Sequence, residues 1–100
     1  METMDRAFGV QADGRELAER EYRICMVDTS TKLLTNKIDA ASLLAAVASD
    51  ICSNDLTMIY SFEKERRGAV DGRSAAEKVR QSMMEEMTGF IVKKRAGMPG

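Results

Sequence analysis

The sequence has no histidine, no tryptophan, one proline and only two cysteines among its 100 residues. Histidine is the usual general base near neutral pH and the commonest metal ligand, so its absence excludes triads that pair it with serine or cysteine. Cys25 and Cys52 are too few and too far apart for a zinc site. We therefore expect no catalytic residue, no metal, no cofactor and no enzymatic activity.

Phosphate-binding loops and a strong net charge are also missing. The seven glycines form neither a GxGxxG nor a GxxxxGKS/T pattern. Fifteen lysines and arginines face 16 acidic residues, and the net charge of −1 provides no global positive field for a polyanion. The acidic pairs Glu63 with Glu65 and Glu85 with Glu86 lie among basic residues, which favours a solvated helix face over a cation or acid–base site.

Long apolar stretches are absent as well. No run of about 18 apolar residues occurs, which excludes a membrane-spanning helix. The first ten residues, METMDRAFGV, lack the apolar core of a signal peptide. We expect a cytoplasmic protein without a membrane partner, in which Cys25 and Cys52 are reduced and buried thiols.

The composition is that of one small globular domain, with 44% hydrophobic and 31% charged residues. Residues 1–12 show no apolar period and are expected to form a flexible N-terminal arm. Residues 13–94 are expected to form a single helical domain, and the glycines and proline in residues 95–100 predict a flexible C-terminal tail.

The strongest helical pattern covers residues 74–94. Ser74 and Glu77 form a capping box, which predicts the start of the helix at Ser74. Apolar residues then recur every three or four positions on one face, and Gly89 is the point where the helix could stop. The residues of this face are Ala76, Val79, Met83, Met87, Phe90 and Ile91.

A second helix is predicted over residues 39–52, with Asp39 as its cap. We expect its core face to consist of Ala40, Leu43, Leu44, Val47 and Ile51. The sequence Ser53-Asn54-Asp55 predicts a break, and Asn54 or Asp55 can cap the segment that follows.

Two further segments, residues 15–34 and 55–67, are ambiguous between helix and strand. Both contain β-branched and aromatic residues, at 22–27 and at 56–62. Their apolar residues also fit helical faces, and the surrounding charged runs favour helix. The fold prediction is therefore an all-α, compact bundle of about four helices, and the runner-up is a small α+β domain with strands near 22–27 and 56–62.

Residues 13–20 (DGRELAER) resemble residues 71–78 (DGRSAAEK) at a spacing of 58 positions. A polar turn containing glycine, followed by alanine and glutamate, is typical of a helix start. We therefore interpret the similarity as two helix starts and not as a duplication.

These patterns predict a small, non-enzymatic protein-binding regulator or adaptor that self-associates as a dimer through a methionine-rich helix face. Unbranched thioethers adapt to irregular partner surfaces, and Met84, at the edge of the apolar face, is the favoured intermolecular contact. Nearby cations would orient acidic groups of the partner. The predicted partner-binding residues are Met83, Met84, Met87, Phe90, Ile91, Arg66, Arg67, Lys93 and Lys94.

The alternative is a DNA-binding transcriptional regulator. The segments 39–52 and 55–67 have roughly the proportions of a helix-turn-helix motif, in which Arg66 and Arg67 would meet DNA. The acidic residues Glu63 and Glu65 in the would-be recognition helix, the missing glycine in the turn and the negative net charge make this nucleic-acid partner less favoured.

Overall fold

The computed structural model describes residues 3–97, and the side chains from Gly14 onward. These residues contain helices and no strand, which confirms the all-α fold and shows that segments 22–27 and 56–62 are helical. Four α-helices and one short 3-10 turn follow one another along the chain: α1 (Thr3–Lys32), η1 (Leu33–Thr35), α2 (Ala41–Ile51), α3 (Ser53–Arg67) and α4 (Ala69–Arg95).

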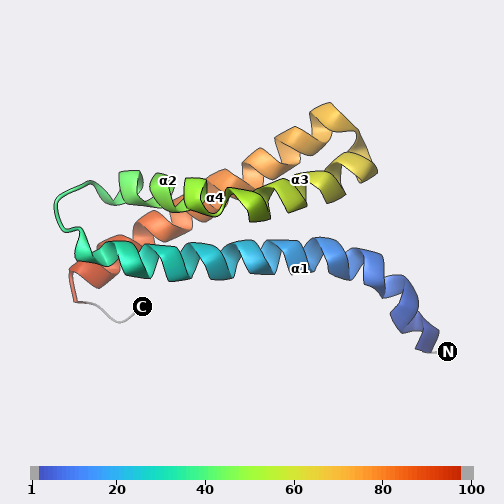
Figure 1. Ribbon diagram of the computed structural model, residues 1–100, viewed down its shortest axis with the longest axis horizontal. Helices are drawn as coiled ribbons and strands as arrows, with labels where there is room; N and C mark the ends of the chain where they lie inside the picture. Colours follow the sequence, from blue (N-terminus) through green and yellow to red (C-terminus); the bar gives the residue numbers. More distant parts are fainter. Residues whose placement is uncertain (1–2, 98–100) are drawn as a thin grey trace.

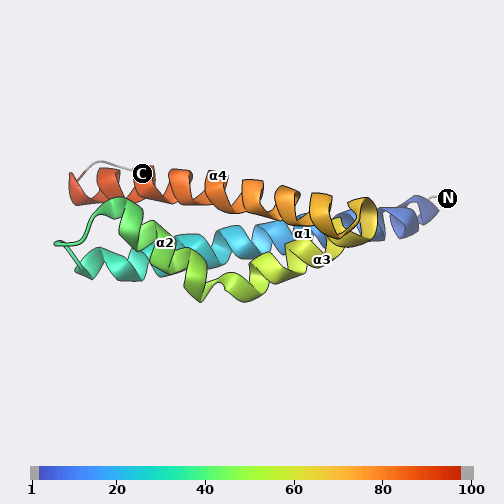
Figure 2. The ribbon, with the colours of Figure 1, turned by 90° about the horizontal axis from the view of Figure 1, so that it is seen from above.

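The helices form three roughly parallel rows. The long helix α1 makes the first row, α2 and α3 return along it in tandem as the second, and α4 runs back beside them (Figure 1). Seen from above, α2 and α3 meet at an angle and bow away from α4 (Figure 2). The principal extents of 52, 32 and 16 Å describe an elongated, flat molecule. None of the helices over residues 3–97 is long and apolar enough to cross a bilayer.

The predicted start of the last helix at Ser74 is wrong. Helix α4 begins at Ala69, directly after Gly68, whose φ of 90° lets the chain turn within one residue. Ser74 therefore lies inside the helix, and the Glu77 carboxylate accepts hydrogen bonds from Arg80 and Gln81 instead of capping. Gly89 does not end the helix either, since α4 continues to Arg95.

The predicted caps of the second and third helices are also wrong. Helix α2 begins at Ala41 without a side-chain cap, and the Asp39 carboxylate accepts a hydrogen bond from Asn36 instead. Only Cys52 separates α2 from α3, so the expected three-residue break is a single residue and neither Asn54 nor Asp55 caps α3. In each case the local sequence predicted a helix in the right region but not the residue at which the helix begins.

Helix α1 begins at Thr3, well before Arg15, where the periodicity placed its start. Residues 3–12 of the expected arm are thus helical in the structure, and α4 ends at Arg95, at the start of the expected tail. Residues 98–100 of that tail lie outside the described residues. The division of the chain into arm, domain and tail stays a prediction.

The core lies where the three rows meet and is built from a few large side chains among many small ones. Tyr22, Met26, Ile59, Met83 and Met87 are fully or almost fully buried in it. The Tyr22 hydroxyl shares a 2.8 Å hydrogen bond with Ser49, so the polar end of this buried ring has a partner on α2. Alanines fill the remaining positions, which lets the helix backbones approach one another. These are Ala18, Ala45, Ala48 and Ala76.

Helix α2 presents to the core a different face from the one predicted. Its buried residues are small or sit at the flank of the predicted face: Ala41, Leu44, Ala45, Ala48 and Ser49. Of the predicted core residues only Leu44 is buried, while Leu43, Val47 and Ile51 are exposed. Because Tyr22 and the core methionines already fill the space beneath α2, small side chains fit there and larger ones are left outside.

Of the two similar DGR segments, residues 71–78 lie at a helix start as expected, whereas residues 13–20 lie inside a helix. Gly14 lies well inside α1 and Gly72 in the first turn of α4, and both face the same stretch of α3. A Cβ at Gly72 would lie 2.8 Å from the Lys64 Cα, and a Cβ at Gly14 would lie 3.0 Å from the Phe62 ring. Gly72 therefore marks a place where α4 lies against the α3 backbone, whereas Gly14 faces the ring of an α3 side chain.

Cys25 and Cys52 are not the reduced thiols expected from the sequence, because they form a disulfide bond. The bond joins α1 to the residue between α2 and α3, with the two Cα atoms 6.0 Å apart. The 27-residue separation in sequence gave no sign of this proximity, which arises only because α2 and α3 return along α1. The covalent link fixes the break between the two tandem helices against α1.

Replacing Gly72 with alanine should destabilise the protein by about 1 to 3 kcal/mol, because the new methyl group must push α4 away from the α3 backbone. Gly89→Ala is the matched control, since a Cβ there meets nothing within 4 Å. That control should stabilise the helix by up to about 1 kcal/mol. Urea unfolding followed by circular dichroism measures both changes, and equal effects of the two variants would contradict a close α3–α4 contact.

Removing the disulfide by the double change Cys25→Ser and Cys52→Ser should lower the free energy of unfolding by about 3 kcal/mol, from the entropy of the loop that it closes in the unfolded chain. Thermal unfolding with and without a thiol reductant checks this prediction. The wild type should lose stability on reduction and the double variant should not; a wild type whose melting temperature ignores reductant would contradict the bond.

Candidate functional site

The predicted methionine-rich strip does not form one surface. Met83, Met87 and Ile91 are buried in the core of the single chain and are unavailable to a partner while it is folded. Met84 and Phe90 are half-buried and pack against that core. The periodicity that suggested a binding face thus marks the side of α4 that holds the bundle together.

The predicted basic residues are split between the two ends of the molecule. Arg66 and Arg67 lie at the end of α3, near the α3–α4 corner, whereas Lys93 and Lys94 lie in the last turn of α4 at the opposite end (Figure 1). The Arg67 guanidinium also donates to Glu63 at 2.7 Å. These four cations therefore cannot contribute to one compact site.

An exposed apolar surface lies on α2, where the sequence predicted core residues. Leu43, Val47 and Ile51 occur at intervals of four residues on one side of the helix and are 50%, 36% and 60% exposed. Asp50 is the only charged residue among the 11 of α2. We call the three residues Leu43, Val47 and Ile51 the outer face of α2. The sequence signal for it was an excess of apolar residues all round this helix, of which only one side can be buried.

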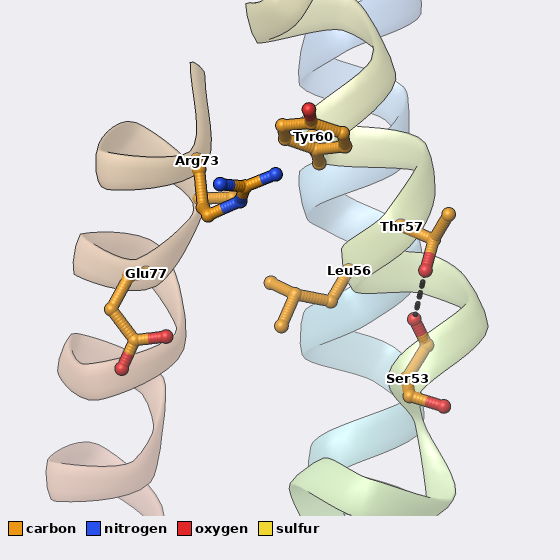
Figure 3. Close-up of a pocket in the computed structure, with 7 residues that line it drawn as sticks. Ser53, Leu56, Thr57, Tyr60, Arg73 and Glu77 are labelled. Atoms are coloured by element: carbon orange, nitrogen blue, oxygen red, sulfur yellow. Dashed lines mark hydrogen bonds between the residues drawn. The ribbon is translucent and has the colours of Figure 1, made fainter. Parts of the chain in front are cut away.

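A shallow groove runs between α3 and α4 and has a volume of about 250 Å³. Leu56 and Ala76 contribute its apolar side, and Tyr60, Arg73 and Glu77 its polar rim (Figure 3). The Arg73 guanidinium carbon lies 5.9 Å from the centre of the Tyr60 ring, within the range of a cation–π contact. With one cation and one carboxylate on its rim, the groove has no single charge preference and contains no nucleophile paired with a base.

Glu63 is buried and ion-paired, and not part of the solvated face expected for Glu63 and Glu65. Its carboxylate accepts hydrogen bonds from Arg15 at 2.6 Å and from Arg67 at 2.7 Å. The bonds from Arg15 and then Arg67 lower the pKa of Glu63 against the opposing effect of burial. Both oxygens are thus occupied by guanidinium groups, and the carboxylate links α1 to α3.

The other chemistries considered for the sequence find no site in the described part of the chain. Residues 3–97 contain no group of three or more histidine, cysteine, aspartate or glutamate side chains placed to hold a metal ion. A helix-turn-helix motif joins two packed helices by a turn of three or four residues, whereas only Cys52 separates α2 from α3 and the two follow one another along α1 (Figure 1).

Comparison with known proteins found no match: no family model, no curated protein and no solved structure is significantly similar to this chain. The arguments for function therefore depend on the surfaces of the molecule itself. Among these, the outer face of α2 consists of exposed residues that belong to neither core cluster of the described chain.

Replacing Glu63 with glutamine should lower the free energy of unfolding at pH 7 by about 3 kcal/mol, because Arg15 then loses its buried partner. The folded-state pKa of Glu63 is below its ordinary value of 4.5. Its stabilising contribution is therefore complete above that value and is lost as the pH falls through the lowered pKa. The difference between wild type and Glu63→Gln should shrink in that acidic range.

Urea unfolding at neutral and acidic pH measures both effects. Glu65→Gln is the matched control, since Glu65 is exposed on the same helix and should change stability by less than about 0.5 kcal/mol. A difference between wild type and Glu63→Gln that persists unchanged at low pH would contradict the ion-paired carboxylate.

Proposed function

We propose that this protein is a small, non-enzymatic interaction protein, a regulator or adaptor, that self-associates through the outer face of α2. The observation that carries the proposal is the exposure of Leu43, Val47 and Ile51 on a helix with a single charge. Keeping three large apolar side chains in water on one helix side is unfavourable, and contact with another apolar surface removes that cost.

A second copy of this chain is the partner that we propose for this face. An apolar, nearly uncharged helix side is complementary to itself, and a two-fold axis across Val47 would place Leu43 of one copy near Ile51 of the other. The two Asp50 side chains lie on either side of that axis, so no like charges meet at the centre. Three residues per copy make a small interface, and we expect a dissociation constant of about 10 to 100 μM.

Three parts of the sequence interpretation stay predictions beside this proposal. Arg66 and Arg67 would orient acidic groups of a further partner, and DNA binding has no structural observation in its favour. The cytoplasmic location is opposed by the Cys25–Cys52 bond, because disulfides are rare in the cytosol. Alkylation of the protein in intact cells, before lysis, tests the location. Alkylated cysteines would indicate a reducing compartment such as the cytosol, and protected cysteines an oxidising one.

Replacing Val47 with glutamate should abolish self-association, because the substitution puts a charge at the centre of the proposed interface. Val47 is outside the core, so the helical circular dichroism signal should be unchanged. Light scattering over a dilution series measures the mass. The wild type should be dimeric at high concentration in both low and high salt, because apolar contacts are not screened, and Val47→Glu should be monomeric throughout.

Val92→Glu is the matched control, since Val92 is an exposed valine on a different helix and the variant should still dimerise. A wild type that remains monomeric at about 1 mM, far above the expected dissociation constant, would overturn the proposal. So would a Val47→Glu variant with the mass of the wild type.

A further inference from the structure

The loop of residues 36–40, between η1 and α2, is held in place by hydrogen bonds from within and from α4. The Asn36 Oδ1 accepts from the backbone N–H groups of Ile38 and Asp39, both at 3.0 Å, and its amide nitrogen donates to Asp39 at 2.9 Å. The Arg95 guanidinium donates to the carbonyl oxygens of Asn36 and Asp39. The loop and the last turn of α4 therefore form one end of the molecule, as both views show (Figure 1; Figure 2).

This fixed loop holds an isoleucine out into water. Ile38 is 94% exposed, more than any other large apolar residue in the described part of the chain. A side chain on a pre-ordered loop loses little further conformational entropy when it binds. No packing against the described residues accounts for an apolar residue at this position, whereas an apolar environment outside the chain would.

The same end of the molecule is positively charged, although the whole chain carries a net charge of −1. A hollow of about 430 Å³ beside the loop is lined by Leu34, Lys37, Lys94 and Arg95, whereas Lys93 lines a separate hollow with Glu85 and Glu86. Among the described residues, no carboxylate lies within salt-bridge distance of these lysines. The nearby Lys32 adds no net charge to this comparison, because it forms an ion pair with Asp28 of the same helix.

We propose that this end of the bundle binds the surface of an anionic lipid bilayer, with Ile38 inserted between headgroups and the lysines against lipid phosphates and carboxylates. A bilayer offers fixed negative charge and an apolar layer directly beneath it, which are the two chemistries that this end presents together. It also requires no complementary shape. One isoleucine and two lysines cover far less than the roughly 800 Å² that each partner buries in a stable protein–protein interface.

Such binding is a surface contact and needs no spanning segment. The expectation of no membrane partner was based on the absence of an apolar run long enough to cross a bilayer, which has no bearing on an inserted loop. The proposal is independent of the outer face of α2, so self-association and membrane binding can fail separately.

Co-sedimentation with sucrose-loaded vesicles tests the proposal. The protein should pellet with phosphatidylcholine vesicles that contain about 30% phosphatidylserine, and about tenfold less with pure phosphatidylcholine. Raising the salt concentration should weaken the binding, because exposed charges are screened. Absence of pelleting with the anionic vesicles at low salt would overturn the proposal.

Two variants separate the apolar from the electrostatic part. Ile38→Ser should bind the anionic vesicles about tenfold more weakly, from the loss of one inserted aliphatic side chain. Lys94→Glu should also weaken binding about tenfold or more, since it removes one cation and adds an anion. Neither side chain is in the core, so circular dichroism and the mass from light scattering should match the wild type.

The far end of the molecule supplies the controls. Val70 is 76% exposed at the α3–α4 corner, and Arg66 is exposed near it. Val70→Ser and Arg66→Glu repeat the two chemical changes away from the proposed site and should leave vesicle binding unchanged. An Ile38→Ser variant that binds like the wild type, or controls that weaken binding as much as the test variants, would overturn the proposal.

Discussion

The close approach of α4 to α3 at Gly72 is the contact on which the rest of the bundle depends. With no side chain at Gly72, the backbone of α4 can lie against Lys64 and Glu63 of α3. This spacing brings Ala76 into the core and, farther along α4, places Met83 and Met87 over Tyr22 and Met26. The alanines of α2 are then the side chains that fit the remaining space, so the choice of which α2 face is buried follows from the same constraint.

Helix α1 is held to α2, Cys52 and α3 by three different kinds of interaction. Near one end, the buried Glu63 carboxylate receives Arg15, and near the middle the Tyr22 hydroxyl meets Ser49. The disulfide between Cys25 and Cys52 adds a covalent link where the tandem helices bend. A chain of this size buries a limited apolar area, and its core leans on alanine and methionine. Polar and covalent links of this kind compensate for the scarcity of large aliphatic and aromatic side chains.

The two surfaces that we propose to be functional consist of side chains that the packing of the bundle leaves exposed. Because the buried side of α2 is filled mostly by small side chains and Leu44, its other large apolar residues face outward and form the proposed contact between copies. Because Arg95 and Asn36 fix the loop before α2, Ile38 is held in solvent beside a set of lysines. In the strip that the sequence favoured for binding, Met83 and Met87 belong to the interior of the protein, and Met84, the favoured contact, is half-buried against it. Periodicity identified an apolar face correctly but could not tell whether another helix of the same chain covers it.

The sequence by itself determined the helical class, the number of helices and the approximate position of each, because apolar periodicity, charge runs and the turn residue Gly68 act within a few positions of each other. It also located the apolar side of α4. Tertiary structure alone decided that Cys25 meets Cys52, that Glu63 is buried between two arginines, that Gly72 lies against the α3 backbone and that α2 buries its alanines. Each of these depends on which residues, far apart in the chain, share one small space. That is a matter of volume and distance between helices, and no local pattern contains it.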